Sequence, residues 1–438
     1  MNEIYNFILL LLIIEIKSYY TIPFKLEEIP LNLDDETLIK TLFFNGALIK
    51  VKIGSLKEEI SVKIKSTSQL TYIINSNTSS YQEKLFNSNK SSTLEITGKK
   101  KLHYNNQDIN NGIYVKDNFI FENEKENKLN FILTDELSKN SHSKGSGAIS
   151  LGKKTNSIYK PEFDFILTQL KNLNIINDET FTFHFTKKNE GNLIIGNYLY
   201  DIKQPLYLKE AFQEINCNKE LEDYIYGISV DIKSGNNELD SNIIIFAHEF
   251  GLIIASTNYY DLISKNFFDK LSKEKCENKL FEVDGIYPNI FNQHYYYYVC
   301  DKDININNFP SLIISNSEID FNIEFTYQDL WFEYNNKKYF LVVFPKSDEF
   351  EHYMRFLFGN LFFKKYDVSF DADRKIVGFY DKNKKTNDKH FYWILLFFVI
   401  LIGIFVYLIF LIKKYKKRFI KKKSAHELEE DGFFQIIK

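Results

Sequence analysis

The sequence predicts an all-β protein with few short helices, and two observations lead to this prediction. Residue types that favour strands are abundant, with 41 Phe and 29 Tyr in 438 residues, because aromatic and β-branched side chains fit a pleated surface. Short apolar or alternating runs also recur, and stretches rich in Asn, Ser, Lys and Asp separate them, as in folds with many hairpins. The expected strands are 48–54, 59–65, 118–121, 128–134, 180–185, 192–196, 228–232, 242–247 and 339–344.

Helical patterning is sparse. Apolar residues repeat at helical spacing in 163–174 and 257–273, which predicts one helix midway along the chain and one in its latter half. The run of four tyrosines from Tyr295 to Tyr298 predicts a strand with half of its rings packed. A chain of 438 residues fits two domains or one large two-lobed unit.

The charge balance argues against nucleic acid as a partner. With 55 basic and 58 acidic side chains the net charge is −3, so no global excess of positive charge is present to attract phosphate. The distribution is uneven, because residues 413–438 hold nine basic and four acidic side chains. A charge step of this kind marks a membrane boundary or a tail with a partner of its own.

Both ends of the chain carry membrane signals. Residues 391–412 are 22 consecutive uncharged residues, enough at about 1.5 Å per residue to cross a bilayer as one helix. Eight basic side chains fall within the next eleven residues, which puts that side in the cytosol by the positive-inside rule. The short apolar run 7–14 predicts a signal peptide over residues 1–18, although its leader lacks the usual positive charge.

These signals define the expected topology of a single-pass membrane protein. Residues 19–390 face the lumen or the exterior, Phe391–Ile412 spans the plasma membrane or an endomembrane, and the basic tail 413–438 is cytosolic. The basic run either only stops translocation or also contacts anionic lipid.

The exterior side makes two kinds of modification chemically possible. Asn77 and Asn89 each begin a glycosylation sequon. An oxidising compartment also permits a disulfide between Cys276 and Cys300, which leaves Cys217 unmatched.

Two short motifs each lack one residue that their chemistry requires. The segment from Gly147 to Lys154 nearly matches a phosphate-binding loop, but Lys154 replaces the Ser or Thr that would bind magnesium. His248 and Glu249 begin a zinc-protease pattern, but Leu252 replaces the second histidine. We therefore expect no metal and no cofactor.

Several segments, taken in order, resemble the pepsin-like aspartic protease family. They are 47–73, similar to the first hairpin and active-site strand; 146–152, similar to the Asp-Gly-Ile-Leu-Gly-Leu-Gly segment; 190–196, similar to the interlobe strand; 243–263, similar to the second active-site strand and its helix; and 356–380, similar to the C-terminal Ile-Leu-Gly-Asp segment. The last is the best match, with Gly359, Tyr366 and Gly378 in register. The resemblance implies a bilobal fold, with lobes of about 40–185 and 186–380 around a long peptide-binding cleft.

In each lobe of that family one aspartate is catalytic, and here the resemblance places Lys65 and Ala247 at those positions. The family's chemistry needs two carboxylates that share one proton and hold a water between them. An ammonium group and a methyl group can do neither job. The resemblance therefore implies an ectodomain without an intact catalytic pair.

The resemblance also implies roles for three other residues. Tyr104 matches the tyrosine of the family's flap, a hairpin that closes over bound peptide; an ordinary exposed loop aromatic is the alternative. Cys300 matches the family's second-lobe cysteine, and because its usual downstream partner is absent, Cys276 is the available mate.

We expect a membrane-anchored pseudoprotease that binds a peptide or protein in the interlobe cleft without cleaving it. The alternatives are an active endopeptidase with rearranged catalytic residues and a stable surface module whose function lies in its loops or tail.

Overall fold

The computed structural model divides the chain into two compact units, Met1–Asp381 and Lys382–Lys438. The structure describes residues 19–66, 70–76, 84–98, 102–103, 109–121, 125–137, 145–152, 164–197, 207–209, 227–271, 275–283, 294–316, 321–346, 356–374, 376–381, 397–398, 400–401, 403–405, 407–414 and 416.

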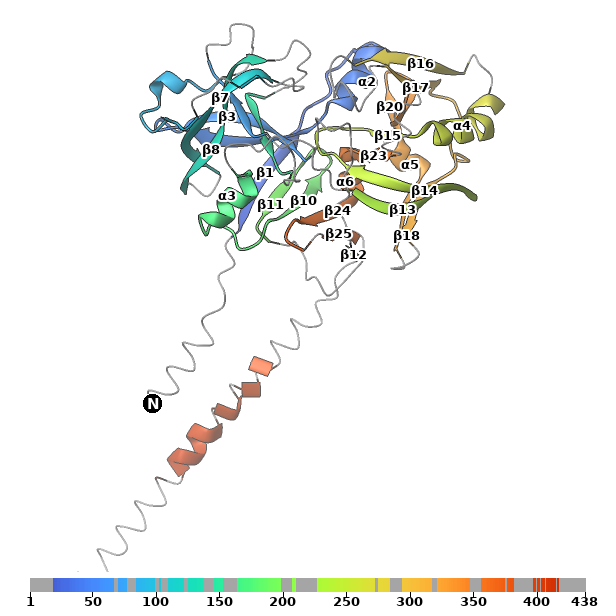
Figure 1. Ribbon diagram of the computed structural model, residues 1–438. Coiled ribbons are helices and arrows are strands. Elements are labelled where there is room, and N and C mark those ends of the chain that lie inside the picture. The colour runs from blue at the N-terminus through green and yellow to red at the C-terminus, as the bar shows by residue number, and fades with distance from the viewer. Residues whose placement is uncertain are drawn as a thin grey trace, which may run out of the picture. The chain divides into compact units, whose positions relative to one another are not determined.

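The first unit is built on two large sheets (Figure 1). The larger has 14 strands in the order β12-β25-β24-β10-β11-β1-β2-β3-β9-β4-β8-β7-β5, and β6 pairs with β7. Its strands are β1 (Tyr20–Leu26), β2 (Ala47–Ile53), β3 (Glu58–Lys65), β4 (Tyr72–Ile74), β5 (Glu95–Ile96), β6 (Leu102–His103), β7 (Ile109–Ile120), β8 (Glu126–Leu137), β9 (Gly147–Ser150), β10 (Thr180–Lys187), β11 (Glu190–Ile195), β12 (Tyr207–Lys209), β24 (Tyr366–Asp371) and β25 (Ile376–Asp381).

The second sheet has 11 strands in the order β19-β18-β13-β14-β23-β15-β22-β17-β21-β20, and β16 pairs with β17. Its strands are β13 (Gly227–Ser234), β14 (Asn237–Phe246), β15 (Ile253–Ala255), β16 (Cys276–Glu282), β17 (His294–Asp301), β18 (Leu312–Asn316), β19 (Phe321–Phe325), β20 (Trp331–Tyr334), β21 (Lys337–Phe340), β22 (Val342–Pro345) and β23 (Phe356–Phe358).

The two sheets are the cores of two lobes, as the all-β bilobal prediction requires. We call β2–β9 the first lobe, the second sheet the second lobe, and β1, β10, β11, β24 and β25 the connecting strands. Figure 1 shows the connecting strands between the lobes. Strand β1 holds this arrangement together, because it pairs with β11 on one side and with β2 on the other.

All nine expected strands overlap observed ones, and both expected helices are present. The helices are α2 (Asp35–Phe43), α3 (Ile166–Asn172), α4 (Thr257–Asn266), α5 (Tyr327–Leu330) and α6 (Asn360–Lys365), with short 3-10 helices η1 (Ser88–Lys90) and η2 (Phe268–Lys270). Among the described residues of the first unit the helices are few and short, as the sequence predicts. Their small number follows from apolar runs that alternate with period two and so favour sheet.

The tyrosine run forms part of β17, but more of its rings are buried than the sequence predicts. Tyr295, Tyr297 and Tyr298 are all buried, and Tyr296 is half-buried. The reason is that both faces of this strand are covered. Tyr298 stacks on Phe268 of η2 with ring centroids 3.5 Å apart, while Tyr295 packs in an apolar cluster with α2.

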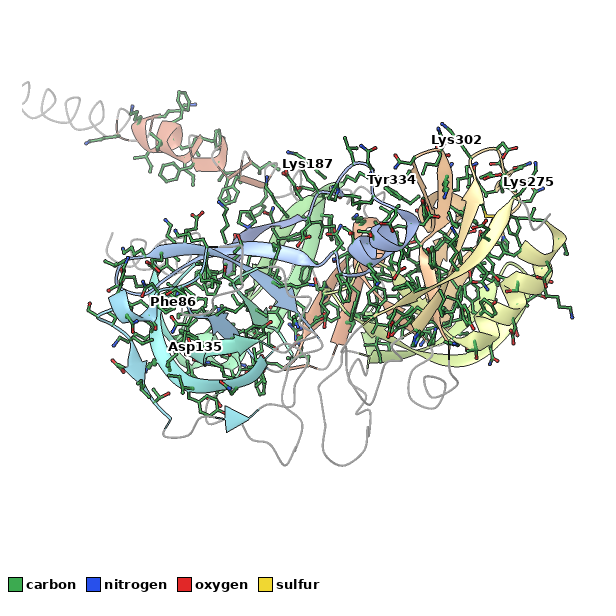
Figure 2. The ribbon with its side chains drawn as sticks, turned by 90° about the horizontal axis from the view of Figure 1, so that it is seen from above. Phe86, Asp135, Lys187, Lys275, Lys302 and Tyr334 are labelled. Atoms are coloured by element: carbon green, nitrogen blue, oxygen red, sulfur yellow. A yellow bond between two sulfur atoms is a disulfide. The ribbon has the colours of Figure 1, made fainter. Side chains whose placement is uncertain are left out.

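Helix α2 was not expected from the sequence, and it packs against the second lobe. Its N-cap Asp34 accepts a hydrogen bond from the backbone N–H of Thr37, which satisfies one of the free donors of the first turn. One face of the helix then joins the second lobe's apolar cluster through Leu38, Ile39, Leu42 and Phe43. Figure 2 shows Tyr334 of the β20–β21 hairpin beside this helix, where its hydroxyl donates to the backbone oxygen of Pro30 at 2.8 Å.

A partly buried ion-pair cluster fixes the start of α2. The Asp35 carboxylate accepts from Lys279 at 2.6 Å, from Lys337 at 2.8 Å and from the Tyr339 hydroxyl at 2.7 Å. Burial raises the pKa of Asp35, but these hydrogen bonds outweigh that effect and lower it to about 2. The carboxylate therefore stays ionised at any physiological pH.

A disulfide joins Cys276 at the start of β16 to Cys300 near the end of β17, where the two residues are direct cross-strand partners. The disulfide therefore ties β16, which lies off the main strand order of the second sheet, to the mostly buried strand β17.

The second unit is described only in part. Residues 397–398, 400–401, 403–405, 407–414 and 416 are helical, and nearly all of them are exposed. Among the described residues, no helix is long and apolar enough to cross a membrane. The expected span Phe391–Ile412 therefore remains an expectation.

Replacing Asp35 by Asn should loosen α2 without disturbing either sheet. The variant loses a charged acceptor for three donors, so we expect the free energy of unfolding to fall by about 1–3 kcal/mol at pH 7. Because the pKa of Asp35 is lowered, its contribution is complete above the unfolded value of 3.8 and is lost as the pH falls toward about 2. Chemical unfolding at pH 7 and pH 2.5 measures both effects. The exposed Glu36 of the same helix supplies a control, Glu36→Gln, and an equal loss in the control would contradict the assignment.

Candidate functional site

The ends of β3 and β14 meet between the lobes, and one serine joins them. Ser66, which directly follows β3, donates from its hydroxyl to the backbone oxygen of Phe246 at 3.0 Å and accepts from the backbone N–H of His248 at 3.1 Å. These are the two chain neighbours of Ala247. The structure thus brings together the segments that carry Lys65 and Ala247, the positions to which the sequence pointed.

Strand β3 delivers two lysines to this junction. Ile60, Val62 and Ile64 alternate into the main core, so Lys63 and Lys65 project from the opposite face of the strand. Both are almost completely buried, at 5% and 8% exposure. The Lys63 ammonium donates to the backbone oxygen of Phe44 at 3.0 Å, which compensates part of the cost of burying it.

Glu249 brings a carboxylate to the same place. Its Oε2 accepts from the backbone N–H of Ser66 at 3.2 Å and lies 3.3 Å from the Ser66 hydroxyl. Burial raises the pKa of Glu249, while Lys65 and Lys63 act in the opposite direction. The carboxyl is therefore held by hydrogen bonds within the junction, 6% exposed.

The imidazole of His248 lies in an aromatic cage next to the junction. Its imidazole lies between the rings of Phe183 on β10 and Phe363 on α6, with ring centroids 3.6 and 3.8 Å away. Its Nδ1 is 3.0 Å from the Ser66 hydroxyl. Burial lowers the pKa of His248 well below its usual range.

Ala247 itself is buried under apolar side chains. It belongs to the cluster that contains the apolar face of α2 together with residues from the ends of β14, β15, β22 and β23, namely Ile245, Ile254, Val343 and Leu357. The chain after α2 also runs close to the turn after β14. At Gly251 a side chain would collide with the backbone oxygen of Leu42, and at Gly46 it would collide with Lys63.

Asn360, at the start of α6, links two of the segments that pack around Ala247. Its side-chain amide donates to the backbone oxygens of Asn45 at 2.8 Å and of His248 at 3.0 Å. It thereby ties the segment after α2 and the turn after β14 to one point. The turn is consequently held from three sides, by Ser66, by Asn360 and by the apolar cluster around α2.

The contact between Ser66 and His248 does not form a nucleophilic triad. In such a triad the acid orients the histidine, and the serine faces the substrate. Here the carboxylate of Glu249 accepts from the backbone N–H of Ser66 and does not orient the histidine, and Ser66 has no exposed surface. The hydroxyl's hydrogen-bonding capacity is used on backbone and imidazole, so its role is structural.

The other residues singled out from the sequence are distributed as follows. Asn89 is exposed in η1, as glycosylation requires. Asn77 and Tyr104 lie outside the described residues, as does Cys217. Sequence reasoning missed the parts that Ser66, His248 and Glu249 play together; their only sequence signal is that they follow the two aligned strands directly.

Comparisons with known proteins agree with the fold. A model of the eukaryotic aspartyl protease family matches residues 47–382 of the chain. No curated protein matches it.

Replacing Ser66 by Ala should destabilise the whole first unit. The change leaves a buried carbonyl and a buried N–H without their side-chain partner, so we expect a loss of roughly 2–4 kcal/mol in the free energy of unfolding. Urea unfolding followed by tryptophan fluorescence measures it. Ser61→Ala, a half-buried serine on the same strand, is the matched control and should change stability by less than about 1 kcal/mol. Equal effects of the two substitutions would show that Ser66 does not link the lobes.

Proposed function

Because this chain belongs to the eukaryotic aspartyl protease family, we propose that its family domain binds a peptide or protein without cleaving it. In this proposal Lys65 and Ala247 occupy the two catalytic positions of the family. The observation that carries the proposal is the chemistry of the junction described above, where the ends of β3 and β14 offer an ammonium group and a methyl group.

The junction's carboxylate is poorly suited to replace the missing pair. Peptide hydrolysis by this family's mechanism needs one carboxylate to accept a proton from water and a second group to protonate the substrate carbonyl. Glu249 is a single carboxylate, already hydrogen-bonded to Ser66 and lying near Lys65.

The burial of Ala247 in an apolar cluster supports binding without catalysis. A catalytic floor must hold a water and admit the scissile peptide bond between two reactive groups. Here the corresponding position is fully buried in the cluster with α2. This burial favours a structural role for the position over a catalytic one.

We also propose that the protein is anchored by Phe391–Ile412, with the family domain in the lumen or outside the cell and the tail 413–438 in the cytosol. The uncharged span and the basic residues that follow it support this topology. The exposed sequon residue Asn89 and the disulfide suit an oxidising exterior compartment.

A second candidate is an active endopeptidase with rearranged catalytic residues. Its support is the raised pKa of Glu249, since perturbed carboxyl groups gather at catalytic sites. The third candidate is a surface module whose partners bind its loops or tail. It differs from the first candidate because its cleft holds no ligand.

Peptidase activity separates the first two candidates. The full-length chain, assayed between pH 3.5 and 7 on a mixture of unrelated peptides, should show no cleavage above a buffer control. Activity that responds to an aspartic-protease inhibitor and disappears in Glu249→Gln would overturn the proposal in favour of the second candidate. Retention of peptides by the immobilised protein, tested in parallel, distinguishes the first candidate from the third.

Topology is tested on cells that express the chain with a tag at each end. We expect the protein to stay in the membrane fraction at alkaline pH, and external or lumenal protease to remove the family domain but not the C-terminal tag. The single change Asn89→Gln should increase gel mobility by about one glycan. A protein recovered in the soluble fraction would rule out the anchor.

A further inference from the structure

His248 combines three properties that together make it a candidate pH sensor. It has no exposed surface, its imidazole stacks on two phenylalanine rings, and it sits where the lobes meet. Phe183 and Phe363 stack on its two faces with interplanar angles of 19° and 18°. Phe181 and Phe370 approach its edge at 6.2 and 5.5 Å.

The hydrogen bonds around His248 fit the neutral imidazole. The Ser66 hydroxyl has one hydrogen and two lone pairs; the hydrogen is donated to Phe246, and one lone pair accepts from the backbone N–H of His248. In the tautomer with its proton on Nδ1, the remaining lone pair accepts from Nδ1–H at 3.0 Å. Nε2 is then the bare nitrogen, and it has no hydrogen-bond partner among the described residues.

A second proton would therefore add a buried donor without an acceptor. It would also place a positive charge in an apolar cage. Attraction of an imidazolium to the two stacked rings favours the charged form only modestly. The cost of taking an unpaired cation out of water is larger, so burial decides the protonation state.

The charged groups near the cage do not change this conclusion. On β24, Asp367 and Asp371 alternate away from Phe370 onto the opposite face of the strand, where they pair with His184 and Arg374. On α6, Lys365 pairs with Asp329, and Lys364 contacts Asn189. At the junction, the Glu249 carboxylate accepts from the backbone N–H of Ser66, and Lys65 is close enough to act on the pKa of Glu249.

We propose that His248 makes the contact between the lobes acid-sensitive: the junction is closed while the imidazole is neutral and loosens when it is protonated. Protonation must disrupt either the aromatic cage or the Ser66 contact, and both belong to the packing of the connecting strands against the turn after β14. The lobes then separate more readily in an acidic compartment than at neutral pH. This property goes beyond peptide binding and holds whether or not the cleft takes a ligand.

The direction of the pH effect follows from linkage. The pKa of His248 is lowered in the folded protein, so as the pH falls below 6.5 the unfolded or opened state takes up the proton first. Stability is complete above that pH and declines below it, with the unfolding equilibrium constant rising about tenfold per pH unit for one proton. The titration of Glu249 changes stability with pH in the opposite direction, because its pKa is raised in the folded protein. Asp35 contributes only at far lower pH.

The test compares unfolding of the full-length chain at pH 7.5, 6.5, 5.75 and 5.0 with that of His248→Asn, in which the amide nitrogen can still donate to Ser66. Both are measured with Glu249 present and in the Glu249→Gln background, which removes the opposing titration. We expect the unfolding constant of the parent to rise about tenfold per pH unit below 6.5, and that of His248→Asn to lose this one-proton dependence. The half-exposed His294 supplies a control, His294→Gln, which should keep the parent's dependence.

Equal pH dependence in the parent and in His248→Asn would overturn the proposal. If the variant does not fold, the parent labelled with nitrogen-15 at its histidine rings provides a second measurement. The His248 resonances should keep their neutral positions at pH 5.5 for as long as the protein is folded. Titration of His248 near pH 6.5 in the folded protein, without loss of stability, would also overturn it.

Discussion

The hydroxyl of Ser66 is the contact on which the arrangement of the lobes depends. A single side chain at the end of β3 satisfies a carbonyl and an N–H on the turn after β14, and both of these groups are buried. Unpaired buried backbone groups are costly, so the two strand ends must stay in register. That constraint fixes where Lys65, Ala247, His248 and Glu249 lie.

Once the register is fixed, the character of the junction follows from its side chains. In an enzyme the floor between the lobes has to stay polar, hydrated and open. In this chain Ala247 allows apolar packing, and α2 supplies the apolar face that covers it. The hydrogen bonds of Asp35 to Lys279 and Lys337 hold the start of α2 in place. In the proposed function, the absence of reactive groups at Lys65 and Ala247 and the apolar packing of Ala247 with α2 both favour a structural junction.

The sequence predicted the strands well because alternation with period two is a strong local signal. Helix α2 carried signals too, with Asp34 as N-cap and Leu38, Ile39, Leu42 and Phe43 on one face, but its nine residues are a short window. The extra burial of Tyr298 could not be predicted, because it depends on η2 packing against β17. Strand β16 is mostly polar and half-exposed, so its pattern shows no buried face.

The site was predictable only as far as alignment reaches. The family resemblance predicts that Lys65 and Ala247 occupy the family's catalytic positions, and the residue spacing rejects His248 and Glu249 as zinc ligands. It could not show that Ser66 contacts the two neighbours of Ala247, because these residues are about 180 positions apart. Nor could it show the cage around His248, whose rings come from β10 and α6.

Whether the junction between the lobes is structural or catalytic can be measured by calorimetric titration with a peptide analogue that carries a hydroxyl in place of the scissile carbonyl. Such analogues bind catalytic floors far more tightly than substrates. At pH 4.5 a structural junction should bind the analogue no more tightly than the matched peptide without the hydroxyl. A hydroxyl-dependent gain of about 100-fold or more, lost in Glu249→Gln, would contradict it.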